Sequence, residues 1–303
     1  MDAVRVNGIR KSFVALERMG LIRRRRAIIT ALSDLSFRIR WGEAYGLLGP
    51  NGAGKSTAVK ILSTLLLPDA GSAEVNGFDV VRQAKEVRKS IGLVLYPDKG
   101  FYARLSGFEN LVYFGRLYGL SKKDAEHRAL ELLKRLDLID AANRSFEEYS
   151  LGIRVRLSIA RALIHDPPII YLDEPTIGLD PLSSRSVRNL LIELKRSGKA
   201  ILLTSHNLWE VEEICDLIGI INKGRIIMEG KPSDIKSKLG LKYVVEVDID
   251  TPSGSKLIRI ETKEPVAELR RLLSTGDKVL GVTVKEPTLE EAFMAAVKDE
   301  RAG

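Results

Sequence analysis

The residues best suited to chemistry form a glycine-rich stretch with one lysine and two hydroxyl residues. In order, the stretch reads Gly49, Pro50, Asn51, Gly52, Ala53, Gly54, Lys55, Ser56 and Thr57. Its spacing matches the phosphate-binding loop in full, in which glycines let backbone N–H groups converge on phosphate oxygens without a Cβ in the way. Lys55 can then reach the β- and γ-phosphates of a nucleotide, and Ser56 can give its hydroxyl oxygen to Mg²⁺.

Two acidic residues and a histidine follow apolar segments further along the chain. Asp173 and Glu174 come directly after the apolar run 169–172, and His206 comes shortly after the apolar run 200–204. Because ligands bind outside the carboxyl ends of parallel strands, we expect all three near the glycine-rich loop. Asp173 can hold Mg²⁺ through its water shell, Glu174 can orient or deprotonate an attacking water, and His206 can contact the γ-phosphate.

Each of these features has a structural alternative. A glycine-rich turn can arise by chance, an Asp-Glu pair after a strand can be a helix cap or a surface pair, and a lone histidine is usually structural. Their occurrence together favours the nucleotide site. The loop also has the context that its motif requires, since an apolar strand is expected over 44–48 and a helix over 57–67.

The elements expected around these residues alternate between strands and helices. Short apolar runs at 44–48, 169–172 and 200–204 are typical of buried parallel strands. Apolar residues recur at helical spacing over 183–197 and through most of 105–165. This alternation predicts an α/β core with a parallel sheet.

Two strands of another kind are expected near the amino terminus. Segments 4–10 and 35–40 alternate apolar and polar residues, as half-buried strands do, and a basic insertion over about 14–30 separates them. Residues 1–40 hold ten Lys or Arg and three acidic residues, so +7 of the chain's net charge of +8 lies there, centred on Arg23–Arg26. We expect a solvated surface loop, with contact to anionic lipid headgroups or to nucleic acid as the sharper interpretations.

The carboxyl-terminal part shows a boundary and a change of pattern. Segments 217–221 and 225–228 should form a hairpin, and a domain boundary is expected within 231–240. Beyond it, 243–249 and 257–260 are predicted strands around a turn at 252–254. Thr288 and Glu291 have the spacing of a capping box for a final helix.

Composition excludes several classes of protein. Hydrophobic residues make up 45% and charged residues 29% of the 303 residues, so wholesale disorder is not expected. A single cysteine, Cys215, excludes a disulfide framework within the chain. We expect neither a signal peptide nor a membrane-spanning helix, because no apolar run approaches about 18 residues.

The segment 149–163 connects these motifs to a known family. It reads Tyr-Ser-Leu-Gly-Ile-Arg-Val-Arg-Leu-Ser-Ile-Ala-Arg-Ala-Leu and resembles the signature of the ATP-binding-cassette (ABC) ATPases, usually written LSGGQ. Ser150 and Gly152 match that signature, whereas Leu151 and Ile153 depart from it. The resemblance implies that the signature meets the γ-phosphate held by another copy, in a head-to-tail dimer around two ATP molecules.

Other positions fit the same family. The segment 176–180, ending in Asp180, resembles the loop that couples the two sites of the dimer. Phe13 resembles the aromatic residue that stacks on adenine, although a core phenylalanine is an equal interpretation. Where the family has a glutamine after the segment 91–94, Tyr96 stands in the ungapped position, and we favour Asp98 as the metal-side ligand.

The segments 101–120 and 286–293 resemble ATP-binding subunits of daunorubicin-resistance and sodium-efflux exporters, in which the permease is a separate polypeptide. The resemblance covers residues 3–230 and implies a P-loop NTPase ABC cassette: a RecA-like core, an antiparallel β subdomain and a helical subdomain at about 100–165. We therefore expect an ATP-binding domain over 1–235 and a small α+β domain over 241–303. The resemblance further implies an ATPase that uses ATP and Mg²⁺ at the cytoplasmic face of the cell membrane, bound there through its permease.

Two other functions are compatible with the family. One is a soluble ABC ATPase that acts on nucleic acid or ribosomes through Arg23–Arg26. One cassette rather than two and the lack of a long coiled-coil insertion speak against it, and no nucleic-acid partner is expected. The other is the ATPase of an importer, against which the exporter-like segment 107–120 speaks.

Overall fold

The computed structural model describes residues 1–19, 23–95, 99–238, 241–251, 254–274 and 278–294. The chain divides into two compact units, Met1–Glu229 and Gly230–Gly303. Among the described residues, no helix is both long enough and apolar enough to cross a bilayer.

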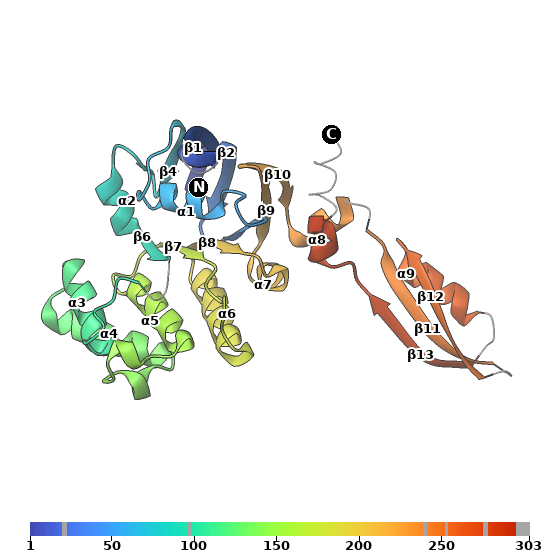
Figure 1. The fold of residues 1–303 in the computed structure, drawn as a ribbon. Coiled ribbons are helices and arrows are strands. Elements are labelled where there is room, and N and C mark those ends of the chain that lie inside the picture. The colour runs from blue at the N-terminus through green and yellow to red at the C-terminus, as the bar shows by residue number, and fades with distance from the viewer. Residues whose placement is uncertain (20–22, 96–98, 239–240, 252–253, 275–277, 295–303) are drawn as a thin grey trace. The chain divides into compact units, whose positions relative to one another are not determined.

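A ten-stranded sheet organises the first unit, in the order β5-β4-β1-β2-β10-β9-β3-β8-β7-β6 (Figure 1). Its strands are β1 (Asp2–Met19), β2 (Arg23–Arg40), β3 (Ala44–Leu48), β4 (Ala70–Val75), β5 (Phe78–Asp79), β6 (Ile91–Val94), β7 (Ile169–Asp173), β8 (Ala200–Ser205), β9 (Leu217–Asn222) and β10 (Arg225–Gly230). The pairs from β9 through β3, β8 and β7 to β6 are all parallel. The predicted parallel core is thus confirmed, and the carboxyl ends of β3, β7 and β8 meet at one edge.

The other part of the sheet is antiparallel and joins the parallel part at β10. Strands β5, β4, β1 and β2 pair antiparallel in succession, and β10 pairs parallel with β2 where Arg225 lies opposite Asp34. Strands β9 and β10 are neighbours, which confirms the predicted hairpin. Its turn has positive φ at both Lys223 (45°) and Gly224 (76°), as a tight hairpin turn requires.

Nine α-helices have defined bounds among the described residues. They are α1 (Lys55–Leu62), α2 (Ala84–Ser90), α3 (Gly107–Leu117), α4 (Lys122–Arg135), α5 (Leu151–Leu163), α6 (Pro181–Arg196), α7 (Leu208–Ile214), α8 (Pro232–Lys238) and α9 (Pro265–Leu273). The helix expected over 57–67 therefore begins and ends earlier. Thr64, just past its end, has a left-handed φ of 63°, which a continuing helix cannot accommodate.

Helices α3, α4 and α5 form the expected helical segment and lie together, apart from the antiparallel strands β1, β2 and β4 (Figure 1). Two short 3₁₀ turns, η1 (Ile139–Ala141) and η2 (Phe146–Glu148), connect α4 to α5. Each of the three helices starts at a serine whose side chain accepts a backbone N–H: Ser106, Ser121 and Ser150. These caps satisfy N–H groups that a helix start otherwise leaves unpaired.

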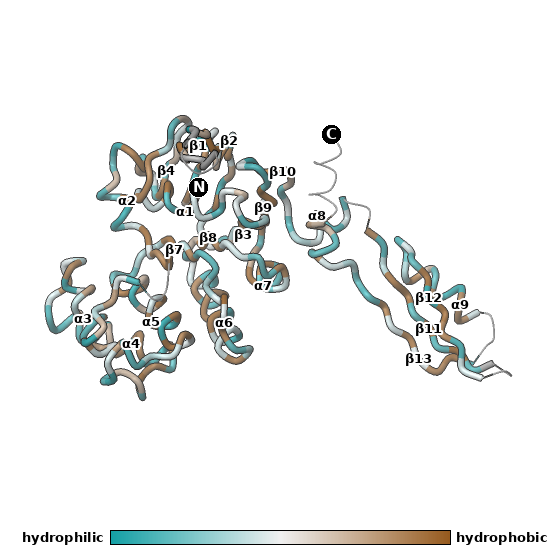
Figure 2. The backbone as a smooth tube through the Cα atoms, in the orientation of Figure 1, coloured by the Kyte–Doolittle hydropathy of each residue, from teal (hydrophilic) through white to brown (hydrophobic). Residues whose placement is uncertain are grey.

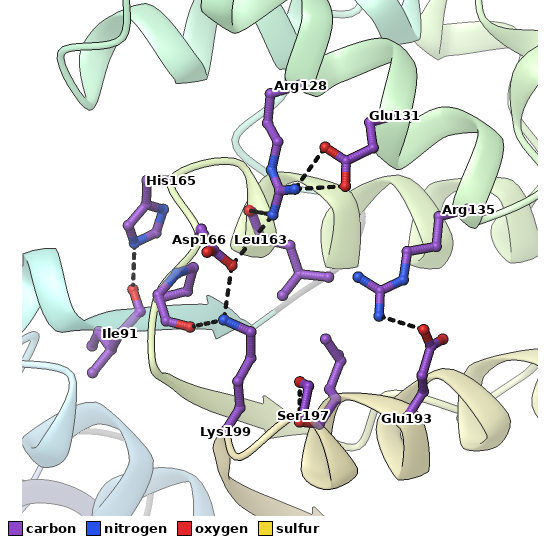
Figure 3. Close-up of polar contacts among 12 residues, drawn as sticks. Ile91, Arg128, Glu131, Arg135, Leu163, His165, Asp166, Glu193, Ser197 and Lys199 are labelled. Atoms are coloured by element: carbon purple, nitrogen blue, oxygen red, sulfur yellow. Dashed lines mark hydrogen bonds and ion pairs between the residues drawn. The ribbon is translucent and has the colours of Figure 1, made fainter.

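Charged side chains fasten the helical segment to the parallel core (Figure 3). Arg128 on α4 lies 3.4 Å from Asp166, which also accepts a 2.8 Å hydrogen bond from Lys199 just before β8. Arg135 on α4 pairs with Glu193 on α6 at 3.0 Å. The position of α5, and with it of Ser150, is thus tied to the strands that carry Asp173 and His206.

The basic insertion is not the loop that we expected. β1 and β2 each run for 18 residues and pair antiparallel as far as Met19 opposite Arg23, so Arg23–Arg26 belong to a strand. The physical reason is strand pairing: β-branched residues such as Val14, Ile28 and Ile29 occur in both arms, and such residues favour a strand once a partner strand is available.

The second unit contains helix α8, a three-stranded antiparallel sheet and helix α9. The sheet has the order β12-β11-β13, with β11 (Tyr243–Thr251), β12 (Gly254–Thr262) and β13 (Lys278–Lys285). Val245, Val247 and Ile249 are its buried core, and Leu269 and Leu272 of α9 pack against them. Hydrophobic and hydrophilic positions alternate along these strands in Figure 2.

This unit confirms some predictions and adds elements that were not expected. The strands predicted over 243–249 and 257–260 are present as β11 and β12. The capping box is also confirmed, since Thr288 and Glu291 exchange backbone-to-side-chain hydrogen bonds of 2.9 and 3.2 Å. Helix α9 and strand β13 were not predicted.

Candidate nucleotide site

The glycine-rich loop connects the end of β3 to the start of α1. Gly52 and Gly54 have φ angles of 82° and 111°, a region that favours glycine. A Cβ on Gly49 would lie 2.3 Å from the backbone oxygen of Ile221, and one on Gly54 would lie 2.5 Å from that of Ala31. The loop conformation therefore depends on glycine at these positions.

The start of α1 leaves backbone donors available for an anion. Gly54 occupies its N-cap position, and no side chain caps the helix there. The first N–H groups of a helix have no partner within it, and the helix dipole adds positive potential at the same end. A phosphate group would meet both.

A cavity of about 320 Å³ lies against this loop. The residues that line it are Ala31, Pro50, Asn51, Gly52, Gly54, Lys55, Ser56, Thr57 and Glu174. Most of the predicted phosphate-binding residues thus surround one space. Ala31 of β2, which the sequence analysis did not single out, supplies a wall of it.

Lys55 is buried at the base of the cavity. Its Nζ donates a 2.6 Å hydrogen bond to the backbone oxygen of Gly49 and lies 3.9 Å from Oε1 of Glu174. Burial lowers the pKa of Lys55, whereas the carboxylates of Glu174 and Asp173 oppose that shift. The hydrogen bonds of the ammonium group go to backbone carbonyls of Gly49 and Pro50. Phosphate oxygens could replace these carbonyls as acceptors.

Glu174 joins three elements of the site. It follows β7 with a left-handed φ of 53°, and its backbone N–H donates to the carbonyl of Thr204 on β8 at 3.0 Å. Its Oε2 lies 2.6 Å from Nδ1 of His206 and accepts from the His206 backbone N–H at 3.2 Å. Non-glycine residues in this conformation are costly, and they concentrate at functional sites.

Asp173 and His206 lie beside Glu174 at the same edge of the sheet. Asp173 accepts a hydrogen bond from the hydroxyl of Thr204, directly across the β7–β8 pair. His206 keeps 60% of its side chain exposed, so its ring is accessible to a ligand. Sequence reasoning missed Thr204, although a hydroxyl at the end of a predicted strand was an available signal.

A buried ionic network lies behind these residues and was also missed. Glu210 on α7 is only 2% exposed and accepts a 2.5 Å hydrogen bond from the hydroxyl of Thr176. Arg188 on α6 lies 3.8 Å from Glu210 and 2.9 Å from Glu213, and its guanidinium stacks over Trp209. The network connects the segment after β7 with the helix that follows His206.

The predicted signature residues occupy a different place. Ser150 caps α5, with its side chain accepting from Ile153 at 3.5 Å, and Gly152 lies in the first turn. Neither is among the described residues that line the cavity. Asp180 caps α6 by accepting two backbone N–H bonds of 3.0 Å, and its bonds with Ser183 lower the pKa of its carboxyl group.

Phe13 lies opposite Ile29 in the β1–β2 pair, with 41% of its surface exposed. Lys11, two residues before it, places Nζ 5.8 Å from the centre of its ring. Tyr96 and Asp98, the two candidates for the position of the family's glutamine, lie outside the described residues.

The oxygen donors at the site suit a magnesium ion. Ser56 lines the cavity, and Asp173 ends β7 beside Glu174 with a carboxylate positioned by Thr204. Mg²⁺ prefers such oxygen ligands and is usually bound by one or two side chains together with substrate phosphates and water. The residues present therefore fit this ion.

Comparison with known proteins identifies relatives over most of the chain. Residues 32–177 match the family model described as ABC transporter. The chain is 46% identical to the doxorubicin resistance ATP-binding protein DrrA of Mycobacterium tuberculosis, over 98% of this chain and 94% of that protein. It is 44% identical to the ABC transporter ATP-binding protein NatA of Bacillus subtilis, over 68% of this chain and 84% of the relative.

Solved structures extend the comparison to the fold. The ATP-binding cassette MJ0796, in a dimeric post-hydrolysis state with ADP and phosphate, is 28% identical with a TM-score of 0.66. The match covers 75% of this chain and 98% of the cassette. A second structure, an ATP-binding subunit of an ABC transporter, matches at the same identity and TM-score over 78% of this chain.

Proposed function

The chain belongs to the ABC transporter family, as an exporter-type ATP-binding subunit whose ATP hydrolysis drives transport, and from this premise we propose how its residues perform the cycle. The loop Gly49–Thr57 and the start of α1 bind the phosphates, and Phe13 stacks on adenine. The Lys55 ammonium group gives up its hydrogen bond to the Gly49 carbonyl and donates to oxygens of the β- and γ-phosphates instead.

Glu174 acts as the general base in this proposal. The observation that carries it is the position of this carboxylate, which lines the cavity while it lies 3.9 Å from Lys55 and 2.6 Å from His206. A water between Glu174 and the γ-phosphate would give its proton to the carboxylate as its oxygen attacks phosphorus. The bond between the γ-phosphorus and the β–γ bridging oxygen would break in the same step, so that ADP leaves with that oxygen and inorganic phosphate is formed. His206 contacts the γ-phosphate and holds the Glu174 side chain in place.

Ser56 and Asp173 would hold Mg²⁺, Ser56 directly and Asp173 through the water shell, with Asp98 as a further metal-side ligand. When bound there, Mg²⁺ would supply positive charge to neutralise the phosphate oxygens. Thr204 supports this site by donating its hydroxyl to Asp173, which fixes the direction of that carboxylate.

Two copies of the chain enclose two ATP molecules head to tail. The Ser150 hydroxyl and the N–H groups at the start of α5 form a second anion site, which meets the γ-phosphate bound by the partner copy. Asp180 couples the two sites. Support comes from the exposed position of Ser150 at a helix start and from the dimeric state of the similar cassette.

The dimer works on a separate permease at the cytoplasmic face of the cell membrane. We expect the segment near residues 96–105, between the parallel core and the helical segment in the sequence, to receive a helix of that permease. Residues 1–235 form the ATP-binding domain and 241–303 an accessory domain. The cargo belongs to the class of molecules that an exporter removes from the cell, as the similarity to the doxorubicin resistance ATP-binding protein DrrA suggests.

The test is the Glu174→Gln variant of the full chain. Gln keeps the size of the side chain but cannot take a proton, so turnover should fall about 100-fold or more while ATP binding persists. ATP should then trap a stable dimer, visible by size-exclusion chromatography with light scattering. Glu147→Gln, at an exposed position on η2, is the matched control. Hydrolysis by Glu174→Gln at the parental rate would contradict the assignment.

A further inference from the structure

The β1–β2 hairpin extends well past the rest of its sheet. Among the described pairs, β1 contacts β4 only as far as Arg10, and β2 contacts β10 only at Asp34. Beyond these points the two strands pair with each other until Met19 lies opposite Arg23. We call residues 13–19 and 23–29 the hairpin extension. It continues well past Phe13, the residue proposed to contact adenine, and the cavity lining includes β2 only at Ala31.

Both faces of the hairpin extension carry exposed apolar side chains, and Phe13 (41%) and Ile29 (52%) lie opposite each other on one of them. Side chains alternate between faces along a strand, so Phe13 shares a face with Lys11, as their contact shows. Val14 and Ile28 lie directly opposite each other on the other face. That face is not the one that carries the proposed adenine contact.

The Val14–Ile28 pair is unusually exposed. Val14 is 69% and Ile28 is 76% accessible, although a cross-strand pair of branched aliphatic side chains normally packs against a neighbour. Burial of such side chains away from water lowers the free energy. Their exposure marks a surface that another apolar phase could cover.

Positive charge accompanies this apolar pair. Residues 14–30 contain five arginines and one glutamate. Arg26 is exposed and, two residues from Ile28 on the same strand, belongs to the same face. Arg23–Arg26 continue β2 toward the end of the hairpin. The hairpin extension thus combines aliphatic side chains with a cationic end.

We propose that the hairpin extension docks on an anionic lipid surface, with Val14 and Ile28 at the level of the headgroups and Arg23–Arg26 on lipid phosphates. A bilayer interface accepts both parts, because interfacial binding adds apolar burial to attraction toward anionic lipid. A nucleic-acid backbone would use the charge alone. The proposal rests on the membrane location proposed above, but the contact is made by this chain itself and does not require the permease.

The experiment is flotation of the purified full chain with phosphatidylcholine vesicles, with and without phosphatidylglycerol. Binding should require phosphatidylglycerol and weaken as salt rises. Replacing Arg23, Arg24, Arg25 and Arg26 with Gln should weaken binding by several hundred-fold, on the order of 1,000-fold at most, since each arginine near an anionic surface contributes about fivefold. Replacing Arg82, Lys85, Lys89 and Arg185 with Gln changes the net charge equally and should leave binding nearly unchanged.

A second variant tests the apolar part. Val14→Thr with Ile28→Thr keeps β-branched side chains, so the strands should persist while binding to phosphatidylglycerol vesicles falls several-fold. ATP affinity, measured in parallel, should stay at the parental value in all variants. This measurement distinguishes a failure of the lipid proposal from a failure of the proposed nucleotide site.

Three results would overturn the lipid proposal. One is equal binding to neutral and anionic vesicles, and another is equal loss in the matched charge control. The third is salt-sensitive binding to RNA that the Arg23–Arg26 variant abolishes while vesicle binding is unchanged, which would assign the hairpin extension to nucleic acid.

Discussion

At the scale of single residues, the site is a set of side chains whose partners can be exchanged for those of a nucleotide. Lys55 donates to a carbonyl of its own loop, and Glu174 accepts from His206. Both are therefore satisfied without ligand, which avoids the cost of an unpaired buried charge. Phosphate oxygens and a water molecule offer equivalent partners, so binding replaces contacts rather than creating a charged site anew.

Lys55→Ala tests the first exchange. Removal of the ammonium group deletes a charge-assisted bond to phosphate, which is worth about 1.5–3 kcal/mol, so ATP affinity should fall about 10- to 100-fold. Titration calorimetry with Mg-ATP measures this directly, with Lys85→Ala as the exposed control. Unchanged affinity in the Lys55 variant would show that the loop binds nucleotide without this side chain.

At the scale of elements, the fold connects the segments that carry the catalytic groups. The Thr176–Glu210 hydrogen bond joins the segment after β7 to α7, and Arg188 of α6 lies beside it. Helix α7 begins two residues after His206. The segment after β7 and the segment that carries His206 are therefore coupled through the buried Glu210 carboxylate. We therefore expect Glu210 to act as a positioning residue.

Thr176→Val should lower the turnover number about 10-fold, because it removes the hydroxyl that donates to the buried Glu210 carboxylate. The affinity of the single chain for ATP should not change. Thr176→Ser keeps the hydroxyl and should restore turnover. Steady-state ATPase assays and calorimetry give the two quantities. If the Thr176→Ser and Thr176→Val variants lose turnover equally, the hydroxyl contact to Glu210 does not position the catalytic segments.

His165, between α5 and β7, predicts a pH dependence of stability. Burial lowers the pKa of His165 to about 4. The ring stacks on Tyr118, and Nε2 contacts the carbonyl of Ile91 (Figure 3). The unfolded chain binds this proton below about pH 6.5 and the folded chain only near pH 4. The stability contribution is therefore complete above pH 6.5 and is lost as the pH falls toward 4.

This loss should reach about 1–3 kcal/mol, since the ring is partly screened by water. Thermal unfolding between pH 7 and pH 4 measures it, and His165→Gln should show a smaller decrease over the same range. An identical pH profile in the variant would mean that other groups, such as the carboxylates, account for the entire acid dependence.

At the scale of the whole molecule, the single chain holds the phosphate loop and the signature in separate places. Ser150 and Gly152 begin α5 and do not line the described cavity. The head-to-tail dimer proposed above would resolve this separation, because each cavity would then receive the signature of the partner. The prediction can be tested by mixing two inactive chains.

Lys55→Ala and Ser150→Arg should each abolish most ATPase activity when assayed alone. A mixed dimer of the two would contain one composite site with an intact loop and an intact signature. Activity should therefore return on mixing, up to about half the parental rate per mixed dimer if the sites work independently. Titrating one variant into the other gives the measurement, and a lack of recovery despite mixed-dimer formation would contradict a site shared between chains.

Parts of this protein were predictable because their signals are local. The loop Gly49–Thr57 has a spacing that phosphate chemistry requires, and Asp173, Glu174 and His206 follow apolar runs whose carboxyl ends meet in any parallel sheet. The turn at Lys223 and Gly224 was predictable for the same reason. The sequence by itself therefore determined the nucleotide chemistry, the α/β core and the family.

Only the tertiary structure decided which charged residues are buried and where strands continue. Glu210 and Arg188 contribute through partners that are distant along the chain, so no local pattern distinguishes them from surface residues. The basic insertion became a hairpin because strand formation depends on a partner strand. The physical reason is common to both: burial and strand pairing are properties of two segments together, whereas a motif is a property of one.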